Sequence, residues 1–424
     1  MDKEDAGYEN ENLQVQNELE LLVAKRNQKK AAPIKKKQKN SALAIFTVVA
    51  LLAASGIYFY REKVFNLAEH IKEKAETVVS TENKTEMKIE NGSKTTFIGF
   101  GNNYLYCTKD GVKYFDGGQN QKWNSTYTMT SPSVVNNESY TAVAEAQGRS
   151  IKVYSQDGEL YSVSADGMIM QISVNSIGSI GLILKTDSGY KVQVYDEKGS
   201  LIMERFDEDE GVYPIAVDVS ADKKVLAVSY LDTTDIEMVS KILFFYTGRE
   251  DTKNTESGDF FASVEKVGEI VPAIKYMNNG IFMAVGDTTI FTMDSSGKEI
   301  WNDEICNKID KIAFSGEYLV MALGEALPGK DGAQNGTVRI LSTAGKQSND
   351  YLLGKSVTYL KAYKNGIVVG SNRDFAALNY NGKLLWEHTA TQDVKDIILM
   401  TSAESVLYVT NNSADIININ KGVQ

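Results

Sequence analysis

The sequence predicts an all-β fold for residues 82–424, a β-propeller with eight blades. Three observations predict it: a β-hairpin pattern recurs along the chain, its turn glycines return every 37–49 residues, and each period holds four strand-like runs. That period and strand count are typical of propeller blades, four-stranded antiparallel sheets arranged around a channel. Seven blades are the alternative if the irregular fourth period is not a blade.

The repeated unit is clearest in FTMDSSGKEIW, residues 291–301. Alternating apolar residues precede a turn rich in Asp, Asn, Ser and Gly, which tolerate a positive φ, and a second short strand follows. Related segments are VKYFDGGQNQKW, IKVYSQDGELYSV, VQVYDEKGSLIMERF, VRILSTAGKQSNDYLL and FAALNYNGKLLWEH, with turn glycines at 118, 158, 199, 297, 345 and 382. A seventh segment around Gly248, ILFFYTGREDTKNTESGDFFASV, has a long polar loop in place of the tight turn.

Two further strand-like runs precede each hairpin, as in KIDKIAFSG and EYLVMALG, which completes four strands per blade. Trp123, Trp301 and Trp386 are expected on the outer strands. After the seventh hairpin only three runs remain, VKDIILMTS, SVLYVTNN and ADIININ. Because an unpaired sheet edge is a liability, we expect residues 82–91 to supply the missing strand and close the ring.

Residues 41–60, SALAIFTVVALLAASGIYFY, are twenty uncharged residues and predict one transmembrane helix, since at about 1.5 Å each they reach about 30 Å. A cleaved signal peptide and a buried core helix are the less favoured alternatives. Eight Lys and Arg residues between 25 and 39 place residues 1–40 in the cytoplasm as a polar, lysine-rich tail. The propeller is then extracellular, and residues 41–60 contact membrane lipid.

Residues 61–81 carry apolar side chains at three- and four-residue steps, which predicts a short helical stalk. Its apolar stripe can pair with a second copy, the membrane or the propeller, so the sequence leaves the oligomeric state open.

The charge balance disfavours a nucleic-acid partner. The whole chain has a formal net charge of −11, and residues 61–424 hold 36 basic against 49 acidic side chains, a surface that repels polyphosphate. The only cysteines are Cys107 and Cys306, too few for a disulfide framework or a cysteine zinc site. They are either two buried thiols or one long-range disulfide.

Familiar catalytic and metal-binding patterns are missing from the sequence, and we predict no enzyme activity and no catalytic, cofactor or metal residues. His70 and His388 are the only histidines, and His70 falls in the stalk, so a His-based zinc site or a Ser-His-Asp triad is disfavoured. His388 is expected to be structural. The acidic run DEDE at 207–210 reads as a solvated loop, and the Gly-rich run at 324–336 lacks the ending of a phosphate-binding loop.

The polar insertions at 231–240 and 324–336 are the candidate contact surface. Both should join the second and third strands of a blade, and such loops emerge on the face opposite the Asp-x-x-Gly turns. Long loops on a rigid scaffold commonly carry binding specificity, although insertions without function are the alternative.

The Trp-terminated hairpins FTMDSSGKEIW and LNYNGKLLW resemble the pyrroloquinoline-quinone-type propeller repeat, over about 330 residues of the chain. The layout of lysine-rich tail, single span, stalk and propeller also resembles a family of unknown function from Firmicutes, particularly clostridia. That resemblance implies an architecture and no functional residue. The calcium ligands, catalytic Asp and vicinal cysteines of quinone enzymes have no counterpart that can be placed here, so no cofactor is predicted.

These observations favour a non-catalytic binding or assembly platform in the cell envelope, for a protein or a cell-wall ligand. The alternatives are a degenerate quinone- or sugar-acting propeller enzyme and a ligand sensor that signals through the stalk. A fold by itself specifies no activity, so the choice depends on the site.

Overall fold

The computed structural model describes residues 79–80, 86–89, 95–248, 259–345, 348–400 and 402–419. Every regular element in these residues is a β-strand. The predicted tail and the predicted transmembrane helix at 41–60 lie outside the described residues, and within them no helix is long and apolar enough to cross a bilayer. Most of the predicted helical stalk also lies outside them. Its residues Val79–Ser80 form strand β1 instead of helix, and β1 pairs with the last strand of the propeller, β33 (Ser413–Ile419).

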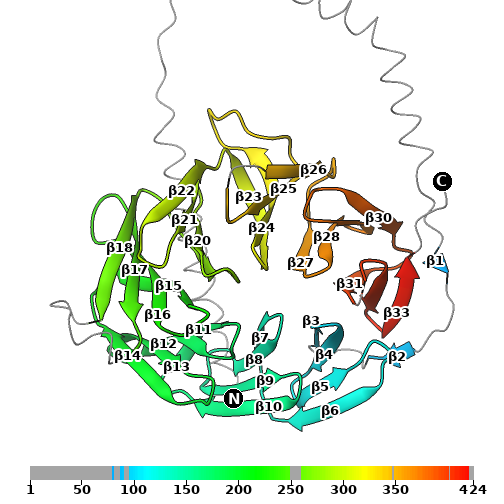
Figure 1. Ribbon diagram of the computed structural model, residues 1–424, viewed down its shortest axis with the longest axis horizontal. Helices are drawn as coiled ribbons and strands as arrows, with labels where there is room; N and C mark the ends of the chain where they lie inside the picture. The colour runs from blue at the N-terminus through cyan, green and yellow to red at the C-terminus, as the bar shows by residue number, and fades with distance from the viewer. Residues whose placement is uncertain are drawn as a thin grey trace, which may run out of the picture. The chain divides into compact units, whose positions relative to one another are not determined.

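Eight antiparallel sheets form the blades, and seven of them contain four consecutive strands (Figure 1). Blades 1 and 2 comprise β3 (Thr96–Phe100), β4 (Asn103–Cys107), β5 (Gly111–Phe115), β6 (Gln121–Thr126), β7 (Pro132–Asn137), β8 (Tyr140–Glu145), β9 (Ser150–Ser155) and β10 (Gly158–Ser164). Blades 3 and 4 comprise β11 (Met168–Val174), β12 (Ile180–Thr186), β13 (Gly189–Tyr195), β14 (Leu201–Asp207), β15 (Val212–Val219), β16 (Val225–Asp232), β17 (Val239–Tyr246) and β18 (Phe260–Val267). Blades 5 and 6 comprise β19 (Ala273–Tyr276), β20 (Phe282–Val285), β21 (Thr289–Met293), β22 (Glu299–Glu304), β23 (Asn307–Ser315), β24 (Tyr318–Ala326), β25 (Thr337–Ser342) and β26 (Ser348–Leu352). Blade 7 comprises β27 (Tyr359–Tyr363), β28 (Gly366–Ser371), β29 (Asp374–Leu378) and β30 (Leu384–Thr389).

The eighth blade closes the ring with strands from both ends of the propeller. Its strands β31 (Val394–Leu399), β32 (Ser405–Thr410) and β33 (Ser413–Ile419) come from the C-terminal part of the chain. Strand β2 (Glu86–Lys88) pairs with β33, with Met87 opposite Ala414. The eight-bladed prediction is therefore confirmed, including the origin of the missing strand within residues 82–91.

The two ends of the blades differ in their connections, and we name the two faces accordingly. The turn face carries the links between first and second strands and between third and fourth strands. The loop face carries the links between second and third strands and from one blade to the next. Because β2 runs antiparallel to β33, the chain enters the propeller at the turn face.

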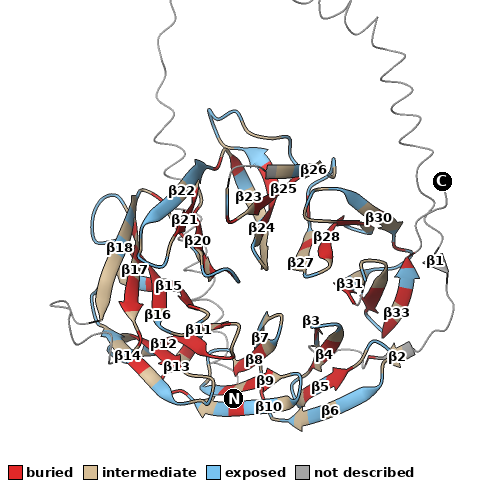
Figure 2. Ribbon diagram, in the orientation of Figure 1, coloured by how far each residue is buried: buried red, intermediate tan, exposed pale blue. Residues whose placement is uncertain are grey.

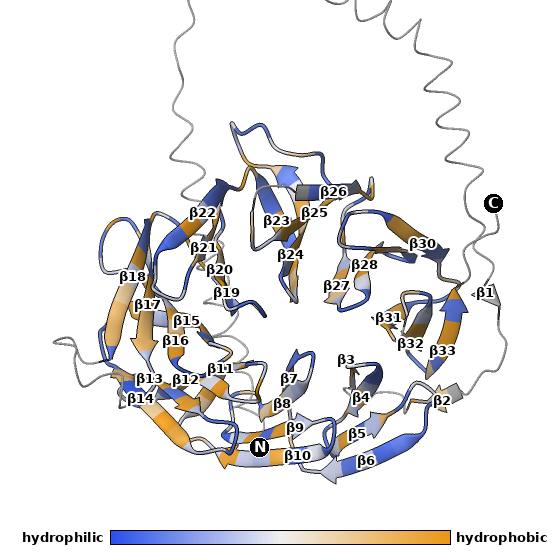
Figure 3. Cartoon of the chain, in the orientation of Figure 1, coloured by the Kyte–Doolittle hydropathy of each residue, from blue (hydrophilic) through white to orange (hydrophobic). Residues whose placement is uncertain are grey.

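Burial follows the position of a strand within its blade. All of β20 and β28, which are second strands, is buried, whereas the outer strands β6 and β22 are exposed along most of their length (Figure 2). A second strand is covered on both faces by neighbouring blades, so it needs apolar side chains at successive positions rather than alternating ones. The connecting loops are largely hydrophilic (Figure 3).

The tight turns form as their sequence predicts. Asp294 Oδ1 accepts hydrogen bonds from the backbone N–H groups of Ser296 (2.9 Å) and Lys298 (3.0 Å), and Gly297 takes a φ of 80°. A short polar side chain thus closes the turn, and glycine supplies the left-handed conformation. In the first hairpin the positive φ falls on Gln119, one residue after the predicted turn glycine.

The three tryptophans lie on outer strands, as predicted, and connect neighbouring blades. Each indole N–H donates to a backbone carbonyl of the following blade: Trp123 to Gln156 (2.8 Å), Trp301 to Thr343 (2.7 Å) and Trp386 to Ala403 (2.6 Å). A β-carbon added to turn Gly345 would lie 2.1 Å from the ring of Trp301. The contact between tryptophan and turn therefore requires glycine at this position.

Candidate functional site

Both insertions predicted as contact loops join the second and third strands of a blade and lie on the loop face. Both loops are shorter than predicted, because β-strand pairing continues into the ends of each insertion. Asp232 still pairs with Val239 at the base of the first, and Ala326 pairs with Asn307 at the start of the second. The loops are residues 233–238 in blade 4 and 327–336 in blade 6.

The blade 4 loop is held at its base by one carboxylate. Asp232 Oδ1 accepts hydrogen bonds from the backbone N–H (3.0 Å) and the hydroxyl (2.6 Å) of Thr234, and Asp232 Oδ2 pairs with Lys241 Nζ at 2.7 Å. The bond from Lys241, followed by those from Thr234, lowers the pKa of Asp232 to about 2. At the tip, Ile236 is fully exposed (104%) between Asp235 and Glu237. A fixed loop therefore presents an apolar side chain between two acidic residues.

The blade 6 loop is held by a buried amide. Asn307 is 2% exposed, and its Nδ2 donates to the carbonyls of Gly324 and Ala333, both at 2.8 Å. Its Oδ1 accepts the backbone N–H of Ala333, also at 2.8 Å. One side chain thereby ties the loop to the first strand of its own blade. Lys330 adds an exposed ion pair with Glu304, whose energetic contribution is small at a solvated surface.

Three of the four residues in the acidic run 207–210 form a solvated link on the loop face. Glu208, Asp209 and Glu210 are exposed, as predicted. Asp207 instead belongs to strand β14, accepts the Tyr230 hydroxyl at 2.8 Å and pairs with Arg205 Nε at 2.8 Å. Sequence reasoning missed this network because Tyr230 lies in the next blade. The loop face between blades 3 and 4 therefore carries surplus negative charge.

Two lysine–aspartate pairs connect inner strands of adjacent blades. Lys275 Nζ lies 3.1 Å from Asp218 Oδ1, and Asp218 Oδ2 accepts the backbone N–H of Tyr276 at 2.6 Å. Burial raises the pKa of Asp218, and the lysine charge opposes that rise. Lys361 pairs in the same way with Asp396 in blade 8, at 2.5 Å. No sequence pattern indicates either pair, since each joins residues that are far apart along the chain.

The cysteines and the described histidine occupy structural positions. Cys107 and Cys306 are both free thiols, so the disulfide alternative is wrong; the expectation of two buried thiols holds for Cys107, whereas Cys306 is only partly buried. Cys107 is buried in blade 1, and burial raises its pKa to about 12. His388 stands edge-on to the ring of Tyr408, with ring centroids 5.8 Å apart, and burial lowers its pKa. Within the described ranges no group of three or more His, Cys, Asp or Glu side chains is arranged to hold a metal ion.

A hollow of about 400 Å³ opens on the turn face. It is lined by the turns between first and second strands of blades 1, 2, 5, 6 and 7, with Leu399 of blade 8 and Gln156 of blade 2. The volume lies within the range of small-molecule sites. The sequence predicts a contact surface on the loop face, and no pattern in it indicates this hollow.

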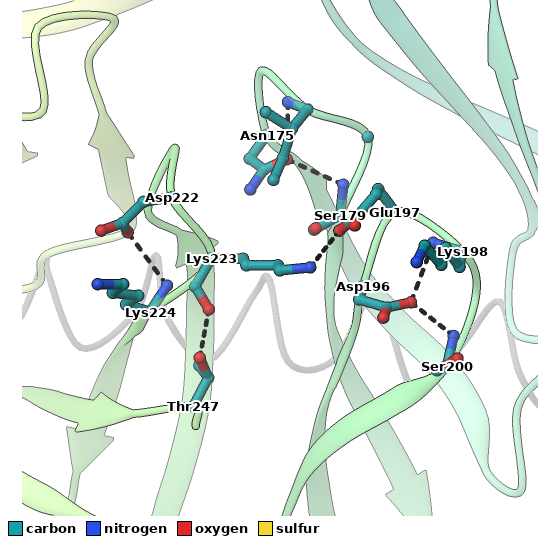
Figure 4. A network of polar contacts seen from close by, with 12 residues as sticks. Asn175, Ser179, Asp196, Glu197, Lys198, Ser200, Asp222, Lys223, Lys224 and Thr247 are labelled. Carbon is teal, nitrogen blue, oxygen red and sulfur yellow. Dashed lines mark hydrogen bonds and ion pairs between the residues drawn. The ribbon is translucent and has the colours of Figure 1, made fainter. Parts of the chain in front are cut away.

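Blades 3 and 4 present a different arrangement on the turn face, where polar groups bind one another (Figure 4). Lys223 of blade 4 pairs with Glu197 of blade 3. Asn175 is buried, its Nδ2 donates to the carbonyl of Ser220 at 2.8 Å, and its Oδ1 accepts the backbone N–H of Ser179 at 2.9 Å. This sector is a structural contact between blades and leaves these groups little capacity to bind a ligand.

The fold and these surfaces define an eight-bladed propeller protein with long, fixed loops on one face and a polar hollow on the other. The chain belongs to the Family of unknown function (DUF5711), whose model matches residues 74–419. A search of curated protein sequences finds no match.

Solved structures with a similar fold have low sequence identity to this chain. BamB from Moraxella catarrhalis is 10% identical, with a TM-score of 0.46, over 82% of this chain and 99% of BamB. Sqt1 from Chaetomium thermophilum is 11% identical, with a TM-score of 0.46, over 78% of this chain and all of Sqt1. A structure described as the eukaryotic initiation factor is 12% identical, with a TM-score of 0.49, over 79% of this chain and 87% of its own.

Proposed function

We propose that this protein is a non-catalytic binding platform, anchored in the cell membrane by residues 41–60 and exposing its propeller outside the cell. The partner is a protein or cell-wall component of the envelope that docks on the loop face. The main support for this proposal is the structure of the blade 4 loop, in which Asp232 fixes the backbone and Ile236 is fully exposed. A fully solvent-exposed apolar side chain on a fixed loop is a candidate anchor for an interface.

The loop face suits a platform for a second reason. The chain enters the propeller at the turn face, so the loop face is the one opposite the point of attachment. The surplus negative charge between blades 3 and 4 favours a partner with basic groups around an apolar contact. The contact loops are already fixed in the free protein, so docking costs little conformational entropy.

The test is site-specific photo-crosslinking in native cells from position 236, with the same crosslinker at Leu201 as the matched control. Leu201 is 48% exposed on an outer strand beside the turn face. We expect position 236 to capture a defined envelope component that position 201 does not, and Ile236→Asp to abolish that complex in a pull-down. Neighbours at position 236 no different from those of abundant membrane proteins would refute the platform.

Membrane anchoring has its own test. Protease added to intact cells should digest the propeller while a cytoplasmic marker survives, and the full chain should float with membranes until residues 41–60 are deleted. A propeller protected in intact cells would contradict the proposed orientation.

A further inference from the structure

The hollow on the turn face is lined by an unusual number of side-chain amides. Asn102, Asn103, Asn136, Asn137, Asn278 and Asn365 all line it. They come from four turns, and three of these carry adjacent asparagines in the sequence: GNNY at 101–104, VNNE at 135–138 and MNNG at 277–280. Turns far apart in the chain therefore bring the same chemical group to one place.

The backbone conformation of these turns does not require asparagine at the positions that line the hollow. Asparagine is common in turns because it tolerates a positive φ or closes the turn with its side chain. Among the described residues the non-glycine positions with positive φ are Gln119, Gln147, Lys223 and Asn372, and none is an asparagine of the hollow. In blade 5, Asn279 closes the turn by accepting the N–H of Ile281, whereas its neighbour at 278 lines the hollow.

Three of these six side-chain amides form no hydrogen bond within the described part of the chain. Asn103 Nδ2 donates to the Tyr114 hydroxyl at 2.6 Å, Asn136 Nδ2 to the carbonyl of Gly99 at 3.4 Å, and Asn365 Nδ2 to the carbonyl of Met400. By contrast, the side chains of Asn102, Asn137 and Asn278 have no hydrogen-bond partner within the described part of the chain. Each of these side-chain amides has two N–H donors and a carbonyl acceptor available to a ligand.

The charges around the hollow are balanced. Glu138 and Lys364 have opposite charge, and Lys275 is already paired with buried Asp218. A balanced site has no net attraction for a strongly anionic or cationic ligand. Partly buried Tyr363 and Phe314 add apolar surface to the lining. The matching ligand is neutral, rich in groups that both donate and accept hydrogen bonds, and apolar on one side.

The walls are fixed before any ligand arrives. The backbone N–H of Gly101 in blade 1 donates to the carbonyl of Glu138 in blade 2 at 3.1 Å, and the N–H of Asn278 in blade 5 donates to Gly316 in blade 6 at 3.1 Å. The Tyr363 hydroxyl donates to the carbonyl of Ile397 in blade 8 at 2.9 Å. Preorganised walls reduce the entropic cost of binding.

We infer that the hollow is a binding site for a neutral saccharide, whose hydroxyl groups pair with the asparagine amides and whose C–H face lies on the aromatic rings. Hydroxyl groups both donate and accept, as the amides do, so both functions of each asparagine are used. This site is on the turn face and is independent of the platform proposed for the loop face.

The experiment is calorimetric titration of the full-length chain, in a detergent without a sugar headgroup, with maltotriose, cellotriose and tri-N-acetylchitotriose, and with trialanine as a peptide comparison. We expect saturable binding of at least one trisaccharide. Removing one amide hydrogen-bonding group should weaken it by about tenfold, with no change in melting temperature, because these side chains have no internal partner. The variants are Asn102→Ala, Asn137→Ala and Asn278→Ala.

The matched control is Asn381→Ala, an exposed turn asparagine outside the hollow, which should leave binding unchanged. Absence of binding by every trisaccharide would overturn the inference, as would binding that survives the triple asparagine variant. Preferential binding of trialanine would also overturn it. Crosslinking from Ile236 on the loop face is unaffected by any of these outcomes, so the two proposals fail separately.

Discussion

Asn307 is the side chain on which the blade 6 loop depends, and its removal should release the loop without unfolding the ring. Asn307→Ala deletes three hydrogen bonds of 2.8 Å at a position that is 2% exposed. Each bond contributes about 1 kcal/mol net, and leaving the N–H of Ala333 without an acceptor costs about 1–3 kcal/mol more unless water reaches it. The free energy of unfolding should fall by about 3–6 kcal/mol, with the lower value expected if water reaches the N–H.

The assay combines urea denaturation with hydrogen exchange. The amide of Ala333 should exchange about 10- to 100-fold faster in Asn307→Ala, while amides in the buried second strands of blades 2 and 7 keep their protection. Asn302→Ala, an exposed change on the outer strand of blade 5, is the control and should alter stability by less than about 0.5 kcal/mol. Unchanged exchange at Ala333 would refute the reasoning, because the loop would then be held by other contacts.

Three further predictions concern turns, pH and thiol reactivity. Gly345→Ala should destabilise the protein by about 2–4 kcal/mol, since the new methyl meets a tryptophan ring, whereas Gly316→Ala, with φ of 58° and open space around it, should cost only about 1–2 kcal/mol in thermal denaturation. The pair between Asp232 and Lys241 should stabilise the protein fully above about pH 4, the ordinary range of an aspartate, and lose that effect as the pH falls towards 2. Asp232→Asn should remove this part of the pH dependence of urea unfolding, and an unchanged profile would contradict it. Cys107 should resist alkylation at pH 8 until urea unfolds blade 1, because its thiol is buried and protonated; rapid labelling of the native protein would contradict this.

The propeller could be predicted because its signals are local. A hairpin such as residues 291–301 contains its own turn chemistry, alternation and outer tryptophan, and a count of strands showed that one was missing at the C-terminal end. The loop boundaries were less accurate, because ladder pairing extends through Asp232 and Ala326 in polar sequence with no apolar pattern. The predictions for residues 1–60 remain predictions, since these residues lie outside the described part.

The candidate sites depend on contacts that no local pattern encodes. Lys275 and Asp218 are 57 residues apart, and they meet because adjacent blades place their first strands side by side around the channel. The three NN pairs were visible in the sequence, yet an asparagine in a turn is ordinarily explained by the turn itself. Their common position becomes evident only when the turns are placed on one face.

The ring geometry explains why the two faces carry different chemistry. Turns between first and second strands lie nearest the central channel, so short polar turns from distant blades converge there and line one open hollow, as the asparagines do. Links between second and third strands lie farther out, so a long one such as residues 327–336 meets its own blade, Glu304 on the outer strand of blade 5, and solvent. The converging turns of the turn face favour a small ligand bound by several blades at once. The widely separated links of the loop face favour a large partner bound by one or two loops. A single scaffold can therefore carry both sites, and a substitution in one loop or turn can change one site while the closed ring preserves the other.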